Sequence, residues 1–356
     1  MTIKIKNIGI LGSGQLGRML IIAATQLGFR THVFAPDAKN SPAGEIAHEI
    51  TEANYDDDDA LSHFGSQIDV VTSEFENVPA RAMNILSNHC HVSPGEKALH
   101  VAQDRMREKN LAKSLGIQTP RFWHIRKQED LVVAMKEMRG KGVLKTCQFG
   151  YDGKGQMMID ADANPEFVCK KFDNDNLILE EYVEFKSEVS FLIARNLNGG
   201  KSLFPPTVNE HKNGILSLSR GPAILPNSVI NIGKDAVVKL ADKLEVVGLL
   251  ALETFVTKRD EILFNEIAPR PHNSFHWTIE GCTSSQFTQL VRAITQMPFG
   301  STSCYGQWEM SNILGKEINF FDKLANQPGT HLHLYGKSDP RPLRKMGHTN
   351  RQIKST

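Results

Sequence analysis

Residues 264–274 read Phe-Asn-Glu-Ile-Ala-Pro-Arg-Pro-His-Asn-Ser, and this stretch is more informative than any other part of the chain. It places a carboxylate, a guanidinium, an imidazole and two amides close together in the chain. A second carboxylate, Glu253, lies in the apolar run 251–256, and the turn-like residues 258–260 separate the two runs. Both runs are rich in strand-forming residues. The pattern therefore predicts a hairpin whose neighbouring strands carry Glu253 and Glu266.

Two carboxylates on neighbouring strands repel each other unless a cation lies between them. Mg²⁺ prefers a few carboxylates together with phosphate oxygens. The hairpin therefore predicts a site for Mg-ATP, with an anionic co-substrate held by Arg270 and His272. The alternative is a solvated strand edge on which Glu266 only caps a turn. Two prolines fix the backbone around Arg270, and polar groups near a core need partners, which favours the site.

The composition is that of a soluble globular protein: 356 residues, 40% hydrophobic and 23% charged, which suits two or three domains. A formal net charge of +1 gives no electrostatic case for nucleic acid or an anionic membrane. The N-terminus lacks the apolar region of a signal peptide, and no run approaches the ~20 apolar residues that span a bilayer. Five cysteines without a Cys-x-x-Cys pair predict a reducing, cytoplasmic location and no disulfide framework.

The first hundred residues alternate between expected strands and helices. This alternation predicts a parallel, doubly wound sheet. The expected strands are 7–11, 31–35 and 68–72, and a helix is expected at 18–27 with Gly28 as its stop. Further along, a helix is expected at 103–115 and another at 235–244, with strands at 142–145, 177–183, 188–193 and 331–335.

The motif Gly12-x-Gly14-x-x-Gly17 follows the first strand and precedes a helix, which is the local context of a dinucleotide fingerprint. Asp37 lies where the ribose-binding acid of that motif would be. The physical content is narrower: glycines let a backbone approach a ligand, and a helix N-terminus favours an anion. The motif alone leaves open NAD, another phosphorylated ligand, and a tight turn that binds nothing.

A second glycine loop, 150–156, reads Gly-Tyr-Asp-Gly-Lys-Gly-Gln. Its glycines predict a flap whose amides wrap phosphates, and Lys145, at a strand end just before it, is placed to hold them. Residues 180–183 end another strand, where backbone groups can recognise an adenine edge and Glu188 can accept ribose hydroxyls. Without further support these are ordinary strand-end acids and a surface turn.

Two more segments carry candidate ligand contacts. Residues 73–78 follow an apolar strand at the carboxyl end of the expected parallel sheet, where ligands bind in open α/β folds. Residues 336–348 are basic and rich in turn-forming residues. This second pattern favours a phosphate clamp over a solvated tail, because arginine forks match phosphate oxygens.

Five of these stretches occur in a familiar order: Gly-Ser-Gly-Gln-Leu-Gly-Arg-Met-Leu, Glu-Phe-Glu-Asn-Val, Gly-Tyr-Asp-Gly-Lys-Gly-Gln, Asn-Glu-Ile-Ala-Pro-Arg-Pro-His-Asn-Ser and Arg-Lys-Met-Gly-His. From about Ile8 to Asn350 the chain resembles the N5-carboxyaminoimidazole ribonucleotide synthetases, purine-biosynthesis enzymes of the ATP-grasp superfamily. One departure is that the chain ends at Thr356, where relatives commonly carry a further terminal helix.

The resemblance implies a mixed α/β and α+β architecture with an ATP-grasp fold. It implies an N-terminal Rossmann-like substrate domain (1–103), an ATP-grasp domain (104–297) and a small C-terminal domain (298–356) with substrate phosphate contacts. It also implies a ligase that uses ATP, Mg²⁺ and bicarbonate to carboxylate 5-aminoimidazole ribonucleotide through carboxyphosphate. A cytoplasmic homodimer without nucleic-acid or membrane partners is expected.

The resemblance also assigns roles by motif position. ATP would be surrounded by Arg105, Lys145, Gly150, Tyr151, Asp152, Gly153, Lys154, Gly155, Gln156, Glu180, Glu181, Tyr182, Val183, Glu188, His211, Asn265 and Glu266. Mg²⁺ would be bound by Glu253 and Glu266. Carboxyl transfer would involve Tyr151, Asp152, Arg270, His272 and Lys345. The ribonucleotide would be held by Gln15, Leu16, Glu74, Asn273, Lys337, Arg344 and Lys345.

Three other functions compete with this interpretation. The nearest is another ATP-grasp ligase, the formate-dependent glycinamide ribonucleotide transformylase, which shares the carboxylate pair and the basic segment. An NAD-dependent oxidoreductase would account for the first glycine motif and Asp37. A non-catalytic nucleotide sensor is harder to reconcile with Arg270, His272 and both carboxylates being present together.

Overall fold

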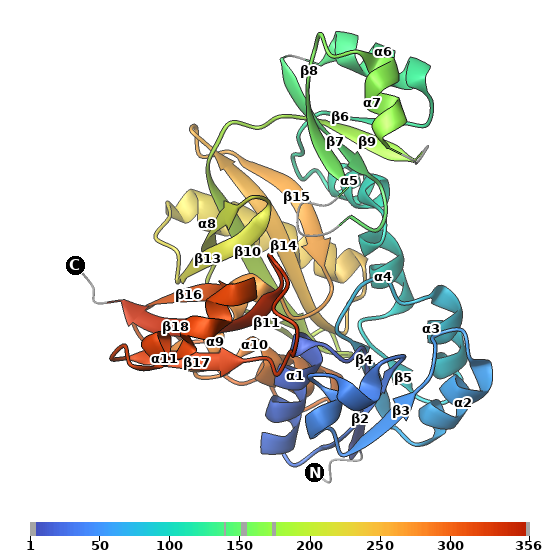
Figure 1. Ribbon diagram of the computed structural model, residues 1–356, viewed down its shortest axis with the longest axis vertical. Coiled ribbons are helices and arrows are strands. Elements are labelled where there is room, and N and C mark those ends of the chain that lie inside the picture. Colours follow the sequence, from blue (N-terminus) through green and yellow to red (C-terminus); the bar gives the residue numbers. More distant parts are fainter. Residues whose placement is uncertain (1–4, 139, 151–154, 173–175, 354–356) are drawn as a thin grey trace.

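The computed structural model describes residues 5–138, 140–150, 155–172 and 176–353. Within these ranges the strands form three sheets, of five, nine and four strands. Figure 1 shows the five-stranded sheet at one end of the molecule, the four-stranded sheet at the other, and the nine-stranded sheet between them. The predicted mixture of helices and strands is confirmed.

The N-terminal sheet is parallel and has the strand order β3-β2-β1-β4-β5. The central strands β1 and β4 are almost entirely buried, as expected for a parallel sheet covered on both faces. The order reverses between β1 and β4, so the loops that follow these two strands meet at one edge. The elements are β1 (Asn7–Leu11), α1 (Gln15–Gln26), β2 (Arg30–Ala35), β3 (Glu49–Glu52), α2 (Asp58–Ser66), β4 (Val70–Ser73), α3 (Ala80–Ser87), β5 (His91–Val92) and α4 (Glu96–Ala102).

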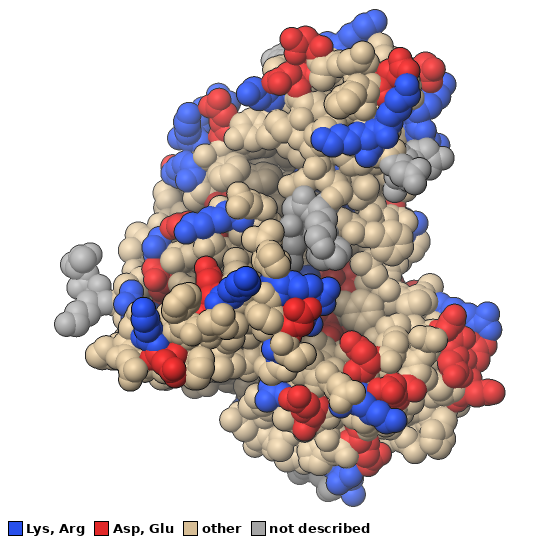
Figure 2. Space-filling model, viewed as in Figure 1, with Lys and Arg blue, Asp and Glu red and all other residues tan. Residues whose placement is uncertain are grey.

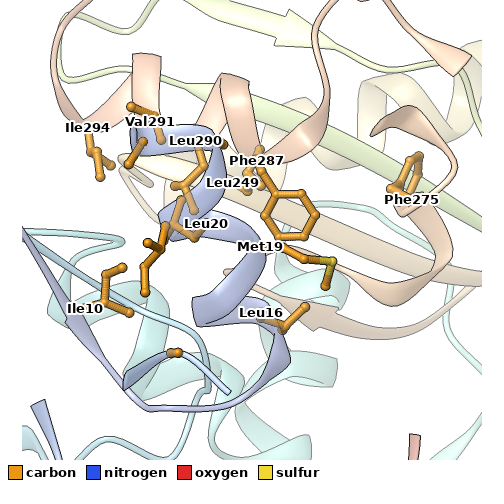
Figure 3. Close-up of a cluster of buried hydrophobic side chains, with 14 of the residues drawn as sticks. Ile10, Leu16, Met19, Leu20, Leu249, Phe275, Phe287, Leu290, Val291 and Ile294 are labelled. Carbon is orange, nitrogen blue, oxygen red and sulfur yellow. The ribbon is translucent and has the colours of Figure 1, made fainter. Parts of the chain in front are cut away.

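The helix α1 attaches this sheet to the rest of the protein. Its apolar face, including Leu16, Met19 and Leu20, packs against Phe287 and Leu290 of α10 (Gln286–Ile294) in one buried cluster (Figure 3). The helix begins at Gln15, three residues before the predicted start, which places the glycine motif directly at its N-terminus. It ends at Gln26, and Gly28 follows in the left-handed region with a φ of 85°.

The four-stranded sheet is antiparallel, in the order β6-β9-β7-β8. Lys145 lies on β7, beside the strand that carries Glu180 and Glu181. The predicted helix at 103–115 is confirmed as α5, which begins at Arg105 because Asp104 caps it by accepting a hydrogen bond from the Arg107 amide at 3.1 Å, and α4 is a separate helix that ends at Ala102. The elements are α5 (Arg105–Ser114), β6 (Phe122–Ile125), α6 (Gln128–Glu137), β7 (Lys141–Thr146), β8 (Gln156–Asp160), α7 (Pro165–Lys171) and β9 (Leu177–Glu181).

The largest sheet has the order β15-β14-β10-β12-β13-β16-β18-β17, and β11 pairs with β10. It continues across residue 298, because β16 pairs with β13. Its elements are β10 (Phe185–Arg195), β11 (Lys201–Leu203), β12 (Thr207–Lys212), β13 (Ile215–Gly221), α8 (Asn227–Lys243), β14 (Gly248–Thr257), β15 (Ile262–Ala268), α9 (Thr278–Gly281), β16 (Gln307–Leu314), α11 (Phe321–Ala325), β17 (Thr330–Leu334) and β18 (Lys345–Ile353). Short 3-10 turns span Ala38–Asn40, Gly44–Ile46, Asn273–Phe275 and Gly315–Phe320.

Candidate active site

A cavity of about 980 Å³ lies where the three sheets meet. On the face seen in Figure 2 the surface is hollowed between these parts, and acidic and basic side chains are interspersed. The cavity brings together residues predicted from motifs far apart in the sequence. The predicted site residues that line it are Gln15, Leu16, Glu74, Arg105, Lys145, Gly150, Gln156, Glu188, His211, Glu253, Asn265, Glu266, Arg270, His272, Asn273 and Lys345.

Other predicted residues lie elsewhere. Those described by the structure but outside the cavity lining are Gly155, Glu180, Glu181, Tyr182, Val183, Lys337 and Arg344. The Arg344 guanidinium donates to the Asp339 carbonyl at 2.9 Å, and Glu181 makes a two-point pair with Arg121. Lys337 donates to the Lys345 carbonyl at 2.9 Å, next to the cavity. Tyr151, Asp152, Gly153 and Lys154 lie outside the described residues.

The predicted hairpin is β14 and β15, and it contains a bulge that the sequence pattern does not reveal. Glu253 pairs with Glu266, but Thr254 pairs with Phe264, so Asn265 is the extra residue on β15. In a bulge two residues of one strand oppose one residue of the other, and the alternation of faces is locally broken. As a result Asn265 and Glu266, adjacent in the chain, both line the cavity with Glu253.

The two carboxylates do not depend on a metal ion to lie side by side. Glu266 accepts a hydrogen bond from Arg105 Nη1 at 2.7 Å, and Glu253 accepts one from His272 Nε2 at 2.9 Å. Burial alone would raise the pKa of Glu253, but the His272 imidazole outweighs it and the pKa is lowered to about 2. The protein therefore supplies a basic partner for each carboxylate, and the Mg²⁺ site stays a prediction.

The donor set nevertheless fits Mg²⁺. The side-chain oxygen of Asn265 is buried and has no hydrogen-bond partner among the described residues. It adds an amide oxygen to two carboxylates, and Mg²⁺ takes oxygen ligands. Within the described residues no group of three His, Cys, Asp or Glu side chains could hold a metal ion by itself. An ion here would therefore need further oxygens, such as those of phosphates or water.

A buried charge cluster positions Lys145. Glu180 bonds to Lys145 Nζ at 3.1 Å and to Lys109 Nζ at 2.8 Å, and both Glu180 and Lys109 are almost completely inaccessible to solvent. Burial alone would raise the pKa of Glu180, but the two ammonium groups lower it to about 2. Two cations share one carboxylate, so the cluster keeps a positive charge next to the cavity, as an anion site requires.

Glu188 and His211 form a pair on neighbouring strands. His211 Nδ1 bonds to the Glu188 carboxylate, which lies on β10 opposite β12. Burial disfavours the imidazolium, but this hydrogen bond and the Glu188 charge outweigh it, and the pKa of His211 is raised. The pair is placed at the cavity wall near Phe185 and Phe255, which stack with ring centroids 4.9 Å apart.

Arg270 and His272 both line the cavity, although β15 ends at Ala268 and the chain bends at Pro269 and Arg270. The alternation of a strand is therefore not what brings Arg270 and His272 to the same cavity. Arg270 pairs with Glu76 at 2.6 Å. His272 Nδ1 lies 2.7 Å from the buried Ser274 hydroxyl, so both ring nitrogens of His272 have partners.

The first glycine motif already holds an anion of the protein itself. The Glu74 carboxylate accepts hydrogen bonds from the Gly14 amide and, at 2.6 Å, from the Gly17 amide. A Cβ atom at Gly12 would lie 2.4 Å from the Glu74 side chain, so this position requires glycine. Burial raises the pKa of Glu74. A dinucleotide pyrophosphate would have to displace Glu74 from these amides, which argues against the NAD alternative.

Three charged residues of the site were not predicted: Glu76, Glu108 and Lys109. Glu76 lies in the Glu-Phe-Glu-Asn-Val motif and pairs with Arg270. Glu108 lines the cavity and accepts a hydrogen bond from the Ile267 amide at 2.9 Å. Arg105, Glu108 and Lys109 share one face of α5 at helical spacing. This spacing was a usable signal, because residues at i, i+3 and i+4 are neighbours on a helix surface and three charged residues there can share partners.

Fold and cavity together define an ATP-grasp protein, and the comparisons agree. Residues 110–287 match the model of the ATP-grasp domain. Residues 5–103 match the ribonucleotide synthetase preATP-grasp domain, and residues 309–355 match the phosphoribosylaminoimidazole carboxylase C-terminal domain. No helix in the described part of the chain has the length and apolarity needed to cross a membrane.

The chain belongs to the family of N5-carboxyaminoimidazole ribonucleotide synthases. The Bacillus subtilis enzyme of that name is 39% identical over 96% of this chain and 90% of its own length. The bifunctional purine synthesis protein purC/E of Dictyostelium discoideum is 41% identical over 97% of this chain, which spans only 37% of that longer protein.

Solved structures agree. An N5-carboxyaminoimidazole ribonucleotide synthetase in complex with ADP superposes with a TM-score of 0.94 at 39% identity, covering 99% of this chain and 93% of that one. The Aspergillus clavatus synthase, in complex with ADP and 5-aminoimidazole ribonucleotide, superposes with a TM-score of 0.90 at 26% identity, covering 99% and 95%.

Proposed function

We propose that this chain uses ATP and bicarbonate to carboxylate the exocyclic amine of 5-aminoimidazole ribonucleotide, giving N5-carboxyaminoimidazole ribonucleotide, ADP and phosphate. The observation that carries the proposal is the convergence of the carboxylate hairpin, the lysine cluster and the Arg270–His272 segment on one cavity. Membership of the family and the ligands of the related structures support the same conclusion.

In the first step a bicarbonate oxygen attacks the γ-phosphorus of ATP, and the bond from that phosphorus to the ADP oxygen breaks. Carboxyphosphate and ADP result. Lys145 and Arg105 line the cavity and would stabilise negative charge on the phosphates. Glu180 holds the Lys145 ammonium, which limits the reorganisation required when the nucleotide arrives. The Glu188–His211 pair would bind the nucleoside end of ATP.

Mg²⁺ would be held by Glu253, Glu266 and the Asn265 oxygen. When bound, it would neutralise charge on the transferring phosphoryl group. His272 contacts one oxygen of Glu253 and Arg105 one oxygen of Glu266, so each carboxylate has a second oxygen that could serve the ion. His272 would be placed for the second step and Arg105 for phosphate.

In the second step carboxyphosphate releases CO₂: the bond from the carboxyl carbon to the phosphate oxygen breaks, and its electron pair leaves with phosphate. The amine nitrogen of the ribonucleotide then forms a bond to the CO₂ carbon. The amine proton passes to phosphate or to a side chain. Arg270, His272 and Lys345 would hold the carboxyl group, because all three line the cavity. Tyr151 and Asp152 are assigned to this step by the resemblance alone.

The ribonucleotide would be held by Gln15, Leu16, Glu74 and Asn273, with its phosphate towards the segment containing Lys337, Arg344 and Lys345. The Asn273 amide is fixed by two hydrogen bonds with Asn312 of β16, so the C-terminal strands orient a substrate contact. A homodimer in the cytoplasm is also proposed, from the family resemblance. Sedimentation analysis would test the dimer.

The experiment is a product assay with purified protein, Mg-ATP and bicarbonate. ADP and carboxylated ribonucleotide are measured with and without 5-aminoimidazole ribonucleotide, and glycinamide ribonucleotide with formate serves as the rival substrate pair. Product from the aminoimidazole substrate in a 1:1 ratio to ADP is expected. Formation of formylglycinamide ribonucleotide instead would favour the transformylase alternative.

A further inference from the structure

One buried side chain links the two histidines of the segment after Pro271. Gln286, the first residue of α10, is completely inaccessible to solvent. Its side-chain oxygen accepts the His272 amide at 2.8 Å, and its side-chain nitrogen donates to the His272 carbonyl at 2.9 Å. The same nitrogen lies 2.9 Å from His276 Nδ1. Gln286 therefore clamps the backbone of His272 and touches the ring of His276.

These contacts determine the protonation of His276 by elimination. A backbone amide can only donate, so the Gln286 atom bonded to the His272 amide must be the oxygen. The other atom is then the NH₂ group, which has two hydrogens, one for the His272 carbonyl and one for His276 Nδ1. Nδ1 must accept, and in a neutral imidazole the proton then resides on Nε2. Burial lowers the pKa of His276 well below its ordinary value, and the nearby basic groups act in the same direction.

The ring of His276 is also fixed in place. It contacts the rings of Phe287 and His348, whose centroids lie 5.6 Å and 4.8 Å away. His276 lines the cavity, and the side-chain hydrogen bond given for it within the described residues is the one at Nδ1, which leaves Nε2 for a ligand. An N–H group held rigidly at the wall of a polar cavity is suited to donate to a bound ligand.

We propose that Gln286 is a positioning residue that fixes the backbone of His272 and holds His276 as the Nε2–H tautomer, so that His276 donates an uncharged hydrogen bond to an oxygen of the carboxyl group being transferred. The inference rests on the proposed function. An uncharged donor suits this place because Arg270, His272 and Lys345 already line the same cavity. A neutral donor stabilises an oxyanion without strengthening the binding of every other anion as a further charge would.

The chain contains a matched control on the same helix. Gln289 is also completely buried, and its amide clamps a remote backbone in the same way: it accepts from the Gly300 amide at 3.0 Å and donates to the Gly300 carbonyl at 2.7 Å. Its third contact is the Ser202 hydroxyl at 3.0 Å instead of a histidine. Gly300 and Ser202 do not belong to the cavity lining.

The test compares Gln286→Glu with Gln289→Glu. A glutamate keeps the acceptor but loses the NH₂ group, so at position 286 it would draw the proton of His276 to Nδ1 and turn Nε2 into an acceptor. Side-chain ¹⁵N NMR, with the His276 signal assigned by its loss in His276→Phe, reports this tautomer directly. We expect Nε2–H in the wild type and in Gln289→Glu, and Nδ1–H in Gln286→Glu. We also expect the yield of carboxylated product per ADP to fall about tenfold to a hundredfold in Gln286→Glu only, with the KM for ATP unchanged.

A wild-type His276 with its proton on Nδ1, or equal product yields in the two glutamate variants, would overturn the inference. If Gln286→Glu does not fold, His276→Phe and His348→Phe replace the pair. Both remove a buried imidazole from the same stack, but His348 does not belong to the cavity lining, so only His276→Phe should lose product. If the wild type forms no carboxylated product, the proposed function has failed, whereas the NMR measurement still decides the tautomer.

Discussion

Lys109→Met tests how much the buried cluster of Lys109, Lys145 and Glu180 contributes to the free energy of unfolding. Lys109 is inaccessible to solvent, its Nζ lies 2.8 Å from Glu180 and 3.3 Å from the Phe264 carbonyl, and it faces the Phe264 ring. Methionine keeps most of the side-chain volume and removes the charge. Glu180, itself almost inaccessible, would be left with Lys145 as its remaining partner within the cluster.

Loss of a buried charged hydrogen bond costs about 1.5–3 kcal/mol, and Lys145 still compensates the Glu180 charge after Lys109 is replaced. We expect the free energy of unfolding to fall by about that amount, a large share of the roughly 5–15 kcal/mol of a typical protein. The pH dependence follows from Glu180, whose folded pKa of about 2 lies below its ordinary 4.5. Its stabilising contribution is present above pH 4.5 and is lost as the pH falls towards 2. The difference between wild type and variant should therefore narrow over that range.

The assay is urea unfolding at pH 7 and at pH values between 5 and 3, with the free energy taken by linear extrapolation. Lys113→Met is the control, since Lys113 lies exposed on the same helix and should change stability by less than about 0.5 kcal/mol. If Lys109→Met were no more destabilising than Lys113→Met at pH 7, the cluster would not contribute as the structure indicates.

Three further outcomes are expected. Glu266→Gln should abolish ATP turnover while circular dichroism shows a folded protein, because it removes a proposed metal ligand as well as the partner of Arg105; near-normal ADP release would remove the metal assignment. Lys145→Met should raise the KM for ATP about tenfold or more, through loss of a charge-assisted hydrogen bond, and leave the KM for the ribonucleotide within about twofold; an equal rise in both would contradict the assignment to phosphate. Mg-ATP at a hundred times its Kd should stabilise the protein by about 2.7 kcal/mol in thermal unfolding, whereas NADH should not; protection by NADH would revive the oxidoreductase alternative.

The features that sequence predicts well here are local. One is the glycine motif between a strand and a helix, and the other is the pair of apolar runs with Glu253 and Glu266. Both can be recognised from residues that are close together in the sequence. The bulge at Asn265 is different, because one extra residue in a strand leaves the composition unchanged. It is nevertheless what turns Asn265 towards the cavity beside Glu266.

The partners of charged residues could not be predicted, because they come from distant parts of the chain. Arg105 bonds to Glu266, which lies 161 positions away in the chain. The hairpin pattern predicts two carboxylates that repel each other, but it does not indicate that Arg105 lies beside one of them. Charged residues on α5 look solvent-exposed until the surrounding elements bury them. The strand β18 was missed for a related reason: His348, Thr349 and Asn350 are polar and buried, so the strand lacks the usual alternation.

In the proposed reaction, bicarbonate is phosphorylated by ATP before its carboxyl group is transferred. Transfer of ¹⁸O from labelled bicarbonate to inorganic phosphate measures this most directly, in a short incubation with 5-aminoimidazole ribonucleotide and Mg-ATP. Because a bicarbonate oxygen attacks the γ-phosphorus, each phosphate released should carry one labelled oxygen, in step with the carboxylated product. Unlabelled phosphate formed alongside product would mean that water, rather than bicarbonate, attacks ATP, and would contradict the account.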